Sequence, residues 1–333
     1  MPGRSLSKRF TSSMSCQNMI LLVCCFLLLA ILLCFPGTAL PLIRESILIW
    51  YQSLLPTLFP AMILSNIILY IFLNIKKYRF RIPILSSVYH LDSYGCLVLL
   101  LGFLCGFPIG AYLCAKLVKE QRLSHRQGQY LLGFCNNLSP VFLISIYCQL
   151  FPVLPKIPVL LLFYGIPLVY GGILSQWSIR SRSKKDTHDA AVILPQLPSG
   201  DQSGRSITEM IDYGITDALS SIVRLAGYII FFRLLLLPLR LLEFDQTYGL
   251  ILGNLIEITS GVQTYSQDAG ASNIYDILVH TLPFMTFGGI CCIGQTICMI
   301  RDSGLSILVY VRDKILQSVL LIIILRLSLP FFG

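Results

Sequence analysis

The sequence predicts an all-α polytopic membrane protein with about seven transmembrane helices and two re-entrant helical hairpins, arranged as inverted repeats. Of its 333 residues, 55% are hydrophobic and only 12% are charged, about half the charged share of a typical soluble domain. Several apolar runs approach the ~20 residues that a helix needs to cross a bilayer. Two of these runs are interrupted by glycines at related positions, and these interruptions predict the hairpins and the repeat.

The apolar runs and the polar stretches between them predict five parts. They are residues 1–41, an N-terminal tail and first transmembrane helix; 42–150, a first repeat of interfacial helix with span, hairpin and broken helix; 151–205, a span and a cytoplasmic linker; 206–302, a second repeat in the same order; and 303–333, a last transmembrane helix. The basic tail and the apolar run Met19–Phe35 also fit a signal peptide. The length of the run and the apolar character of the remaining chain favour an uncleaved span.

The first interruption is the stretch "GFLCGFPIGAYLCAK", from Gly102 to Lys116. Its glycines and Pro108 lie where a transmembrane helix should be most regular. Strongly basic loops flank the segment, so a full crossing would place one of these loops outside, against the positive-inside rule. We therefore expect a hairpin that enters and returns on the cytoplasmic side, where the N-terminus also lies.

The second half of the chain repeats this pattern. Two triplets share a spacing of four residues: Gly102, Gly106 and Gly110, and Gly253, Glu257 and Gly261. A shift of about 151 residues superposes them, and it also superposes two interrupted spans. The flanks of the second segment contain no Lys or Arg, so this hairpin should enter from the outside. Inverted repeats with discontinuous helices are typical of secondary transporters. Simple glycine-mediated helix packing is the alternative.

We expect a substrate site at the hairpin tips and the helix breaks, because half-helix N-termini there present free N–H groups and partial positive charge. Glu257 is informative, because a carboxylate inside the bilayer costs roughly 2.5–3.5 kcal/mol and normally faces a cavity or a partner. It could bind a cation, relay a proton or accept a substrate hydrogen bond. The structural alternative is an ion pair with Arg224 or Arg233.

The polar residues before Pro140 lie where the third span should unwind. Amide side chains there suit either a hard cation or a carboxylate, and plain interhelical hydrogen bonding is the alternative. The equivalent glycines of the second half give backbone access. The candidate substrate-binding residues are Gly106, Pro108, Gly110, Asn136, Asn137, Ser139, Glu257, Thr259, Gly261, Gly288, Gly289 and Gln295.

Enzyme and cofactor motifs are not found in the sequence. The four histidines form no HExxH pattern, the 12 cysteines have no metal-ligand spacing, and there is no GxSxG elbow or phosphate-binding loop. We therefore expect no catalytic residues, no metal site and no nucleic-acid partner. The expected partners are a small anionic substrate and the lipid bilayer. A coupling Na⁺ or H⁺ and a homo-oligomer are left open.

Several short motifs resemble those of a known family. "SLLPTLFPAMIL", "GFPIGAYLCAKLVKEQRLS", "LLGFCNNLSPVFLI", "NLIEITSGV" and "FGGICCIGQTICMI" look like the sporulation integral membrane proteins of the YlbJ type, also called SpoVV, which carry a nucleoside-recognition Gate region. The resemblance runs from about Leu42 to the C-terminus. Two departures are "CNNLSP", which lacks an expected glycine, and "GGICCIGQ", which has cysteines where more polar residues are expected.

This family is similar in plan to concentrative nucleoside transporters. The resemblance implies transport of dipicolinic acid across the membrane around the forespore during endospore formation. Two alternatives stay open: a transporter of a nucleoside or a related small molecule, and a non-transporting membrane scaffold for spore assembly.

Overall fold

The computed structural model describes residues 16–74, 82–182, 207–238, 246–268 and 273–332. These residues form helices and short connections, with no strand among them. The helices are α1 (Cys16–Cys34), α2 (Pro36–Ile49), η1 (Trp50–Leu54), α3 (Leu55–Asn74), α4 (Pro83–Tyr89), α5 (Ser93–Cys105), α6 (Ile109–Lys119), α7 (His125–Cys135), α8 (Pro140–Phe142), η2 (Leu143–Tyr147), α9 (Cys148–Leu150), α10 (Lys156–Arg182), α11 (Ile207–Leu235), α13 (Gln246–Ile256), α14 (Ile258–Asp268), α15 (Ile274–Phe287), α16 (Gly289–Ile300) and α17 (Ile307–Phe332). The N-terminal tail and most of the predicted linker lie outside the described residues.

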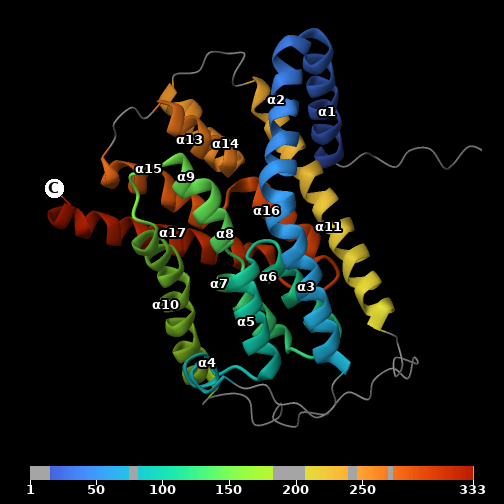
Figure 1. The fold of residues 1–333 in the computed structure, drawn as a ribbon, viewed down its shortest axis with the longest axis vertical. Helices are drawn as coiled ribbons and strands as arrows, with labels where there is room; N and C mark the ends of the chain where they lie inside the picture. Colours follow the sequence, from blue (N-terminus) through green and yellow to red (C-terminus); the bar gives the residue numbers. More distant parts are fainter. Residues whose placement is uncertain (1–15, 75–81, 183–206, 239–245, 269–272, 333) are drawn as a thin grey trace, which may run out of the picture.

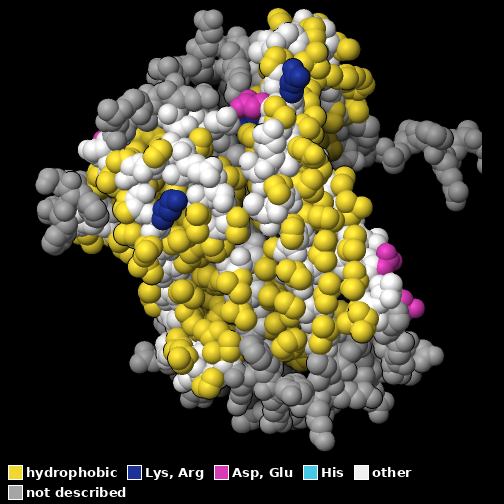
Figure 2. Space-filling view, viewed as in Figure 1, with side chains coloured by type: hydrophobic (Ala, Val, Ile, Leu, Met, Phe, Trp, Pro, Cys, Tyr) yellow, Lys and Arg dark blue, Asp and Glu magenta, His cyan; other side chains and the backbone are white. Residues whose placement is uncertain are grey.

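Long apolar helices make this chain an integral membrane protein. Within the described part, five helical stretches are long and apolar enough to cross a membrane: Pro36–Phe72, His125–Leu150, Lys156–Gln176, Ile207–Leu235 and Ile274–Ile300. A sixth is added if α4 and α5, which bend by 99° at their junction, count as one span. Figure 2 shows one face of the molecule covered mainly by apolar side chains, as expected of a surface that faces lipid.

The first long stretch differs from the predicted interfacial helix followed by a span. One continuous helical stretch is formed by α2, the π-helical turn η1 and α3. Its apolar part, Pro36–Phe72, has 37 residues. At 1.5 Å per residue it is about 55 Å long, well beyond a ~30 Å hydrocarbon core. Figure 1 shows α1 beside the upper end of this stretch.

Each half of the chain contains a hairpin of two short helices. α5 ends at Cys105 and the chain returns as α6, while α13 ends at Ile256 and the chain returns as α14. The arms of each hairpin pack on each other. A Cβ atom added at Gly102 would lie 3.5 Å from Gly110 Cα, and one added at Gly253 would lie 3.7 Å from Gly261 Cα. The predicted glycine spacing therefore does bring the arms together, as small residues do in membrane helix pairs.

Each hairpin is followed by a broken helix. α7 ends at Cys135, and an extended segment leads to Pro140, the first residue of α8. In the second half α15 ends at Phe287, Gly288 adopts a φ of 89°, and α16 begins at Gly289. Both predicted interruptions are confirmed.

The order of elements recurs at the predicted spacing. α13 ends 151 residues after α5, and α15 ends 152 residues after α7. α3 and α11, which precede the two hairpins, pack antiparallel: the ring of Tyr70 lies 6.2 Å from that of Tyr213, and Asn66 Nδ2 donates to Asp217 Oδ2 at 3.0 Å. In Figure 1 the α5–α6 hairpin occupies the lower part of the molecule and the α13–α14 hairpin the upper part.

Candidate functional site

The tip of the first hairpin lies directly on the first helix break. A Cβ atom added at Gly106, where φ is 74°, would lie only 2.5 Å from Ser139 Cα. The backbone N–H of Phe107 donates to the carbonyl of Asn137 at 2.5 Å. A Cβ added at Gly110 would lie 2.7 Å from the carbonyl oxygen of Cys135. This backbone-to-backbone contact requires glycine, because no other residue leaves enough space.

The tip of the second hairpin lies on the second break. A Cβ added at Gly289 would lie 3.2 Å from the carbonyl oxygen of Leu255, at the C-terminal end of α13. Within the hairpin, a Cβ added at Gly261 would lie 2.6 Å from Asn254 Cα. Each tip therefore contacts the break that follows it along the chain.

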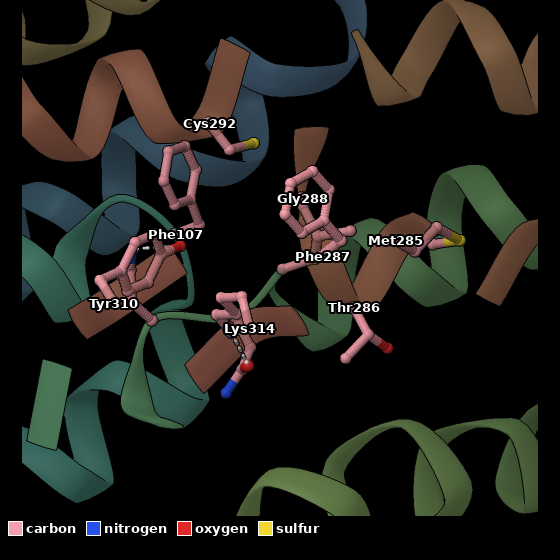
Figure 3. Close-up of a pocket in the computed structure, with 11 residues that line it drawn as sticks. Phe107, Met285, Thr286, Phe287, Gly288, Cys292, Tyr310 and Lys314 are labelled. Carbon is pink, nitrogen blue, oxygen red and sulfur yellow. Dashed lines mark hydrogen bonds between the residues drawn. The ribbon is translucent and has the colours of Figure 1, made fainter. Parts of the chain in front are cut away.

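A small cavity, here called the break cavity, lies between the two breaks, the first hairpin tip and α17 (Figure 3). Its volume of about 10 Å³ is close to the space that one water molecule needs. The residues around it are Phe107, Asn136, Asn137, Leu138, Met285, Thr286, Phe287, Gly288, Cys292, Tyr310 and Lys314.

The amides of the first break connect the two halves. Asn136 Oδ1 accepts from the backbone N–H of Ala111 at 3.2 Å, and its Nδ2 donates to Thr296 Oγ1 and Tyr310 Oη, each at 3.2 Å. Asn137 Oδ1 accepts from Lys314 Nζ at 2.6 Å. Both amides are buried. They hold the first hairpin, α16 and α17 around the break cavity.

A larger cavity, here called the tip cavity, lies between both hairpin tips and the helices α3, α8, α11 and α16. Its volume is about 50 Å³, enough for a few water molecules. The residues around it are Leu54, Thr57, Leu58, Phe107, Leu138, Ser139, Phe142, Leu225, Ile229, Glu257, Ile258, Thr259, Cys291, Cys292 and Gln295. Phe107, Leu138 and Cys292 line both cavities and form the wall between them.

Glu257 is buried at the tip of the second hairpin and forms an ion pair. Its Oε2 lies 3.3 Å from Arg233 Nε, and its Oε1 accepts from Thr259 N at 2.9 Å and from Thr259 Oγ1 at 2.6 Å. Arg233 also lies 3.4 Å from Glu45 Oε2. Burial of this carboxylate is thus offset by a cation and by hydrogen bonds. The ion pair that the sequence analysis gave as the structural alternative for Glu257 is therefore present, with Arg233 and not with Arg224. Glu257 also lines the tip cavity.

Gln295 adds a polar group to the tip cavity. Its side chain is 3% exposed, and its Oε1 has no hydrogen-bond partner in the described part of the chain. Its Nε2 lies 3.1 Å from Cys291 Sγ. A buried amide with an unsatisfied atom is costly unless a ligand or water supplies the partner.

The structure brings seven of the twelve predicted residues to the cavities and leaves five in packing positions. Asn136, Asn137 and Gly288 line the break cavity, and Ser139, Glu257, Thr259 and Gln295 line the tip cavity. The five that line neither cavity are Gly106, Pro108, Gly110, Gly261 and Gly289. The four glycines among them let backbones approach, and Pro108 is the N-cap residue of α6. The role of all twelve residues in substrate binding stays a prediction.

Lys314 is the main site residue that the sequence analysis missed. By the positive-inside rule, Lys314 would belong with Arg301 and Arg312 to the cytoplasmic side of the last span. The structure instead buries Lys314, which is 2% exposed, inside α17 beside the break cavity. An ionisable residue at the margin of an apolar run was the available signal, because such residues usually face the interior of a bundle.

Metal-ligand groups are not found in the described residues: no group of three or more His, Cys, Asp or Glu side chains there is arranged to hold a metal ion. The site is instead built from amides, hydroxyls, one ion pair and one buried lysine.

A comparison with known proteins finds one distant relative, which is a membrane protein of sporulation. A segment of 129 residues, 38% of this chain, is 27% identical to the sporulation integral membrane protein YlbJ of Bacillus subtilis (strain 168). The match covers 31% of that protein's length. No family model and no solved structure matches the chain. The relative supports the resemblance to sporulation membrane proteins, and the nucleoside-recognition region stays a prediction.

Proposed function

We propose that this membrane protein is a secondary transporter of a small organic anion, which binds where the hairpin tips meet the helix breaks. The observation that carries the proposal is that both tips and both breaks surround two adjoining cavities whose linings include buried polar side chains. Irregular backbone at membrane depth is tolerated where it lines such a cavity, and discontinuous helices form the sites of many secondary transporters.

The proposal includes a membrane topology. The two halves are inverted repeats, and the hairpins are re-entrant, one from each face of the membrane. The recurrence of elements after 151–152 residues and the antiparallel packing of α3 and α11 support this arrangement. The N-terminus is cytoplasmic in this scheme.

The proposed substrate is dipicolinic acid, moved across the membrane around the forespore during endospore formation. The motif resemblance supports it, as does the distant relative that is named a sporulation membrane protein. The buried Lys314, which lines the break cavity and has no ion-pair partner among the described residues, favours an anion over a neutral nucleoside.

Uptake into proteoliposomes tests the proposal. We expect radiolabelled dipicolinate to accumulate and uridine not to do so. Glu257→Gln and Asn136→Ala should each reduce the initial rate of uptake at least tenfold, whereas Gly227→Ala, on α11 with open space around it, should leave that rate unchanged. Uptake of uridine alone would favour the nucleoside alternative. No uptake of either compound by a well-inserted protein would favour the scaffold.

The same preparation provides a control for insertion and topology. Ser87 in α4 and Gln121 after α6 are both exposed. Single cysteines at these positions, in a chain without its native cysteines, should react with a membrane-impermeant reagent from the same side. Reaction from opposite sides would mean that the α5–α6 hairpin crosses the membrane.

A further inference from the structure

Lys314 is a buried ionisable residue with no ion-pair partner among the described residues. Its Nζ donates to Asn137 Oδ1 at 2.6 Å, and no carboxylate of the described residues lies within 4.0 Å of it. The neighbouring Asp313 is engaged elsewhere, by Arg312 at 2.7 Å and by Tyr170 Oη at 2.9 Å. An ammonium has three N–H donors, and burying one without an anion is costly. A bound anion would offset that cost.

α16 begins beside the same cavity, which its N-cap residue Gly288 lines and its first helical residue Gly289 does not. α16 has 12 residues, and no side chain caps its first turn, because the N-cap residue is Gly288. Gly288 and Cys292, in the first turn, both line the break cavity together with Lys314. The first N–H groups of a helix lack intrahelical partners, and with the helix dipole they form a ready site for an anion.

The two cavities differ in the sign of their charged groups. Among the residues that line the break cavity, the charged side chain is Lys314 and there is no Asp or Glu. The tip cavity is lined by the carboxylate of Glu257. An anionic group is therefore favoured in the break cavity and disfavoured next to Glu257, because like charges repel.

We propose that Lys314 and the N-terminus of α16 together form a carboxylate-binding subsite in the break cavity, and that Lys314 determines the preference for anions. This inference rests on the proposed transport of an organic anion and places its charged group at named atoms. Figure 3 shows Lys314, Gly288 and Cys292 around this cavity.

The subsite is closed in this structure. The break cavity, at about 10 Å³, has room for one water molecule and not for a carboxylate group. Its wall with the tip cavity is formed by Phe107, Leu138 and Cys292. Phe107 belongs to the tip of the first hairpin, so movement of this tip would join the two cavities and admit the anion.

Binding to the purified full-length chain in detergent tests the subsite without any transport step. The probes are benzoate and benzamide, which have nearly the same shape and differ in charge. We expect benzoate to bind at least tenfold more tightly than benzamide, by calorimetric titration. Lys314→Met should weaken benzoate binding by about 10- to 100-fold, the loss expected for a hydrogen bond to a charged group, and leave benzamide binding unchanged. Lys314→Arg should retain most of the affinity for benzoate.

A control variant separates this role from a structural one. Gln317→Leu alters another buried polar residue of α17, which donates to Gly133 O at 2.8 Å and lines neither cavity. It should bind benzoate like the wild type. Equal affinity of the wild type for benzoate and benzamide overturns the subsite even if Lys314→Met fails to fold. Unchanged benzoate binding in Lys314→Met also overturns it. A chain that binds benzoate as expected but takes up no dipicolinate keeps the subsite and loses the transport function.

Discussion

The two hairpin–break units share one backbone plan but carry opposite chemistry. In the first unit the tip, Gly106–Pro108, has no charge, and the break that it contacts carries Asn136, Asn137 and Ser139. In the second unit the tip carries Glu257, and the break consists of Gly288 and Gly289. In each unit, therefore, polar side chains lie on one partner and glycine on the other.

This difference shows how a repeated architecture builds an asymmetric site. The break cavity takes its amides from the first break, and the tip cavity takes its carboxylate from the second tip. Because each buried polar group needs a partner, a polar tip against a polar break would need more hydrogen bonds than these short segments provide. Glycine on one side lets the other side place its functional groups. The comparison can be tested by removing the charge, the close contact and the cap in turn.

The largest effect on stability should come from the charge in the second unit. Arg233 and Glu257 form a buried ion pair, and Arg233→Met removes its cation. Breaking a buried pair leaves an uncompensated charge and costs about 3–5 kcal/mol. We expect the free energy of unfolding, measured by denaturant titration in detergent, to fall by that amount. The double variant Arg233→Met, Glu257→Gln should recover part of the loss.

Arg224→Met is the matched control. Arg224 lies on the same helix, is exposed and donates to Cys298 Sγ at 3.5 Å, so its replacement should change stability by less than about 0.5 kcal/mol. Similar losses for both arginines would show that the buried pair does not hold the second tip.

The next effect compares the close contacts of the two units. Gly106→Ala combines a backbone conformation that only glycine adopts readily with a Cβ 2.5 Å from Ser139 Cα, and it should cost about 2–4 kcal/mol. Gly289→Ala meets its nearest atom at 3.2 Å and should cost less, about 1–2 kcal/mol. Thermal unfolding in detergent checks both. Gly165→Ala, in α10 with open space around it, should be neutral or slightly stabilising. A larger loss for Gly289→Ala than for Gly106→Ala would reverse the comparison.

The positions of these units could be predicted because the signals are local. Glycine spacing, Pro108 and Pro140 mark the interruptions, since α6 follows Pro108 and α8 begins at Pro140. The shift of about 151 residues between the triplets equals the distance between the ends of α5 and α13. The sequence predicts an interfacial helix that leads into a span here, whereas α2 and α3 form one continuous stretch that contains Pro56 and Pro60. The π-helical turn Trp50–Leu54 just before them is a common adjustment at irregular points in helices.

The partners across the bundle could not be predicted, because they depend on how each helix is rotated. Arg312 and Lys314 are two residues apart, about 200° around a helix with 3.6 residues per turn. Accordingly one is 60% exposed and the other 2% exposed. Arg224 and Arg233 are nine residues apart, about two and a half turns, so they also face opposite sides. Packing against α7 and against the second hairpin decides which member of each pair lies inside.

The smallest effect concerns the helix that follows each break. Ser139 Oγ accepts the N–H of Phe142 at 3.1 Å and caps α8, whereas no side chain caps α16. Ser139→Ala should lower the free energy of unfolding by about 1 kcal/mol, the usual cost of a lost N-cap. Because Gly is itself a fair N-cap residue, Ser139→Gly should lower it through the lost cap by only a few tenths of a kcal/mol. Ser220→Ala, an exposed position on α11, should have almost no effect in the same denaturant titration. If Ser139→Ala is as silent as Ser220→Ala, the cap on α8 contributes nothing. The two helix starts would then be energetically alike, and the free N-terminus of α16 would no longer distinguish the second break from the first.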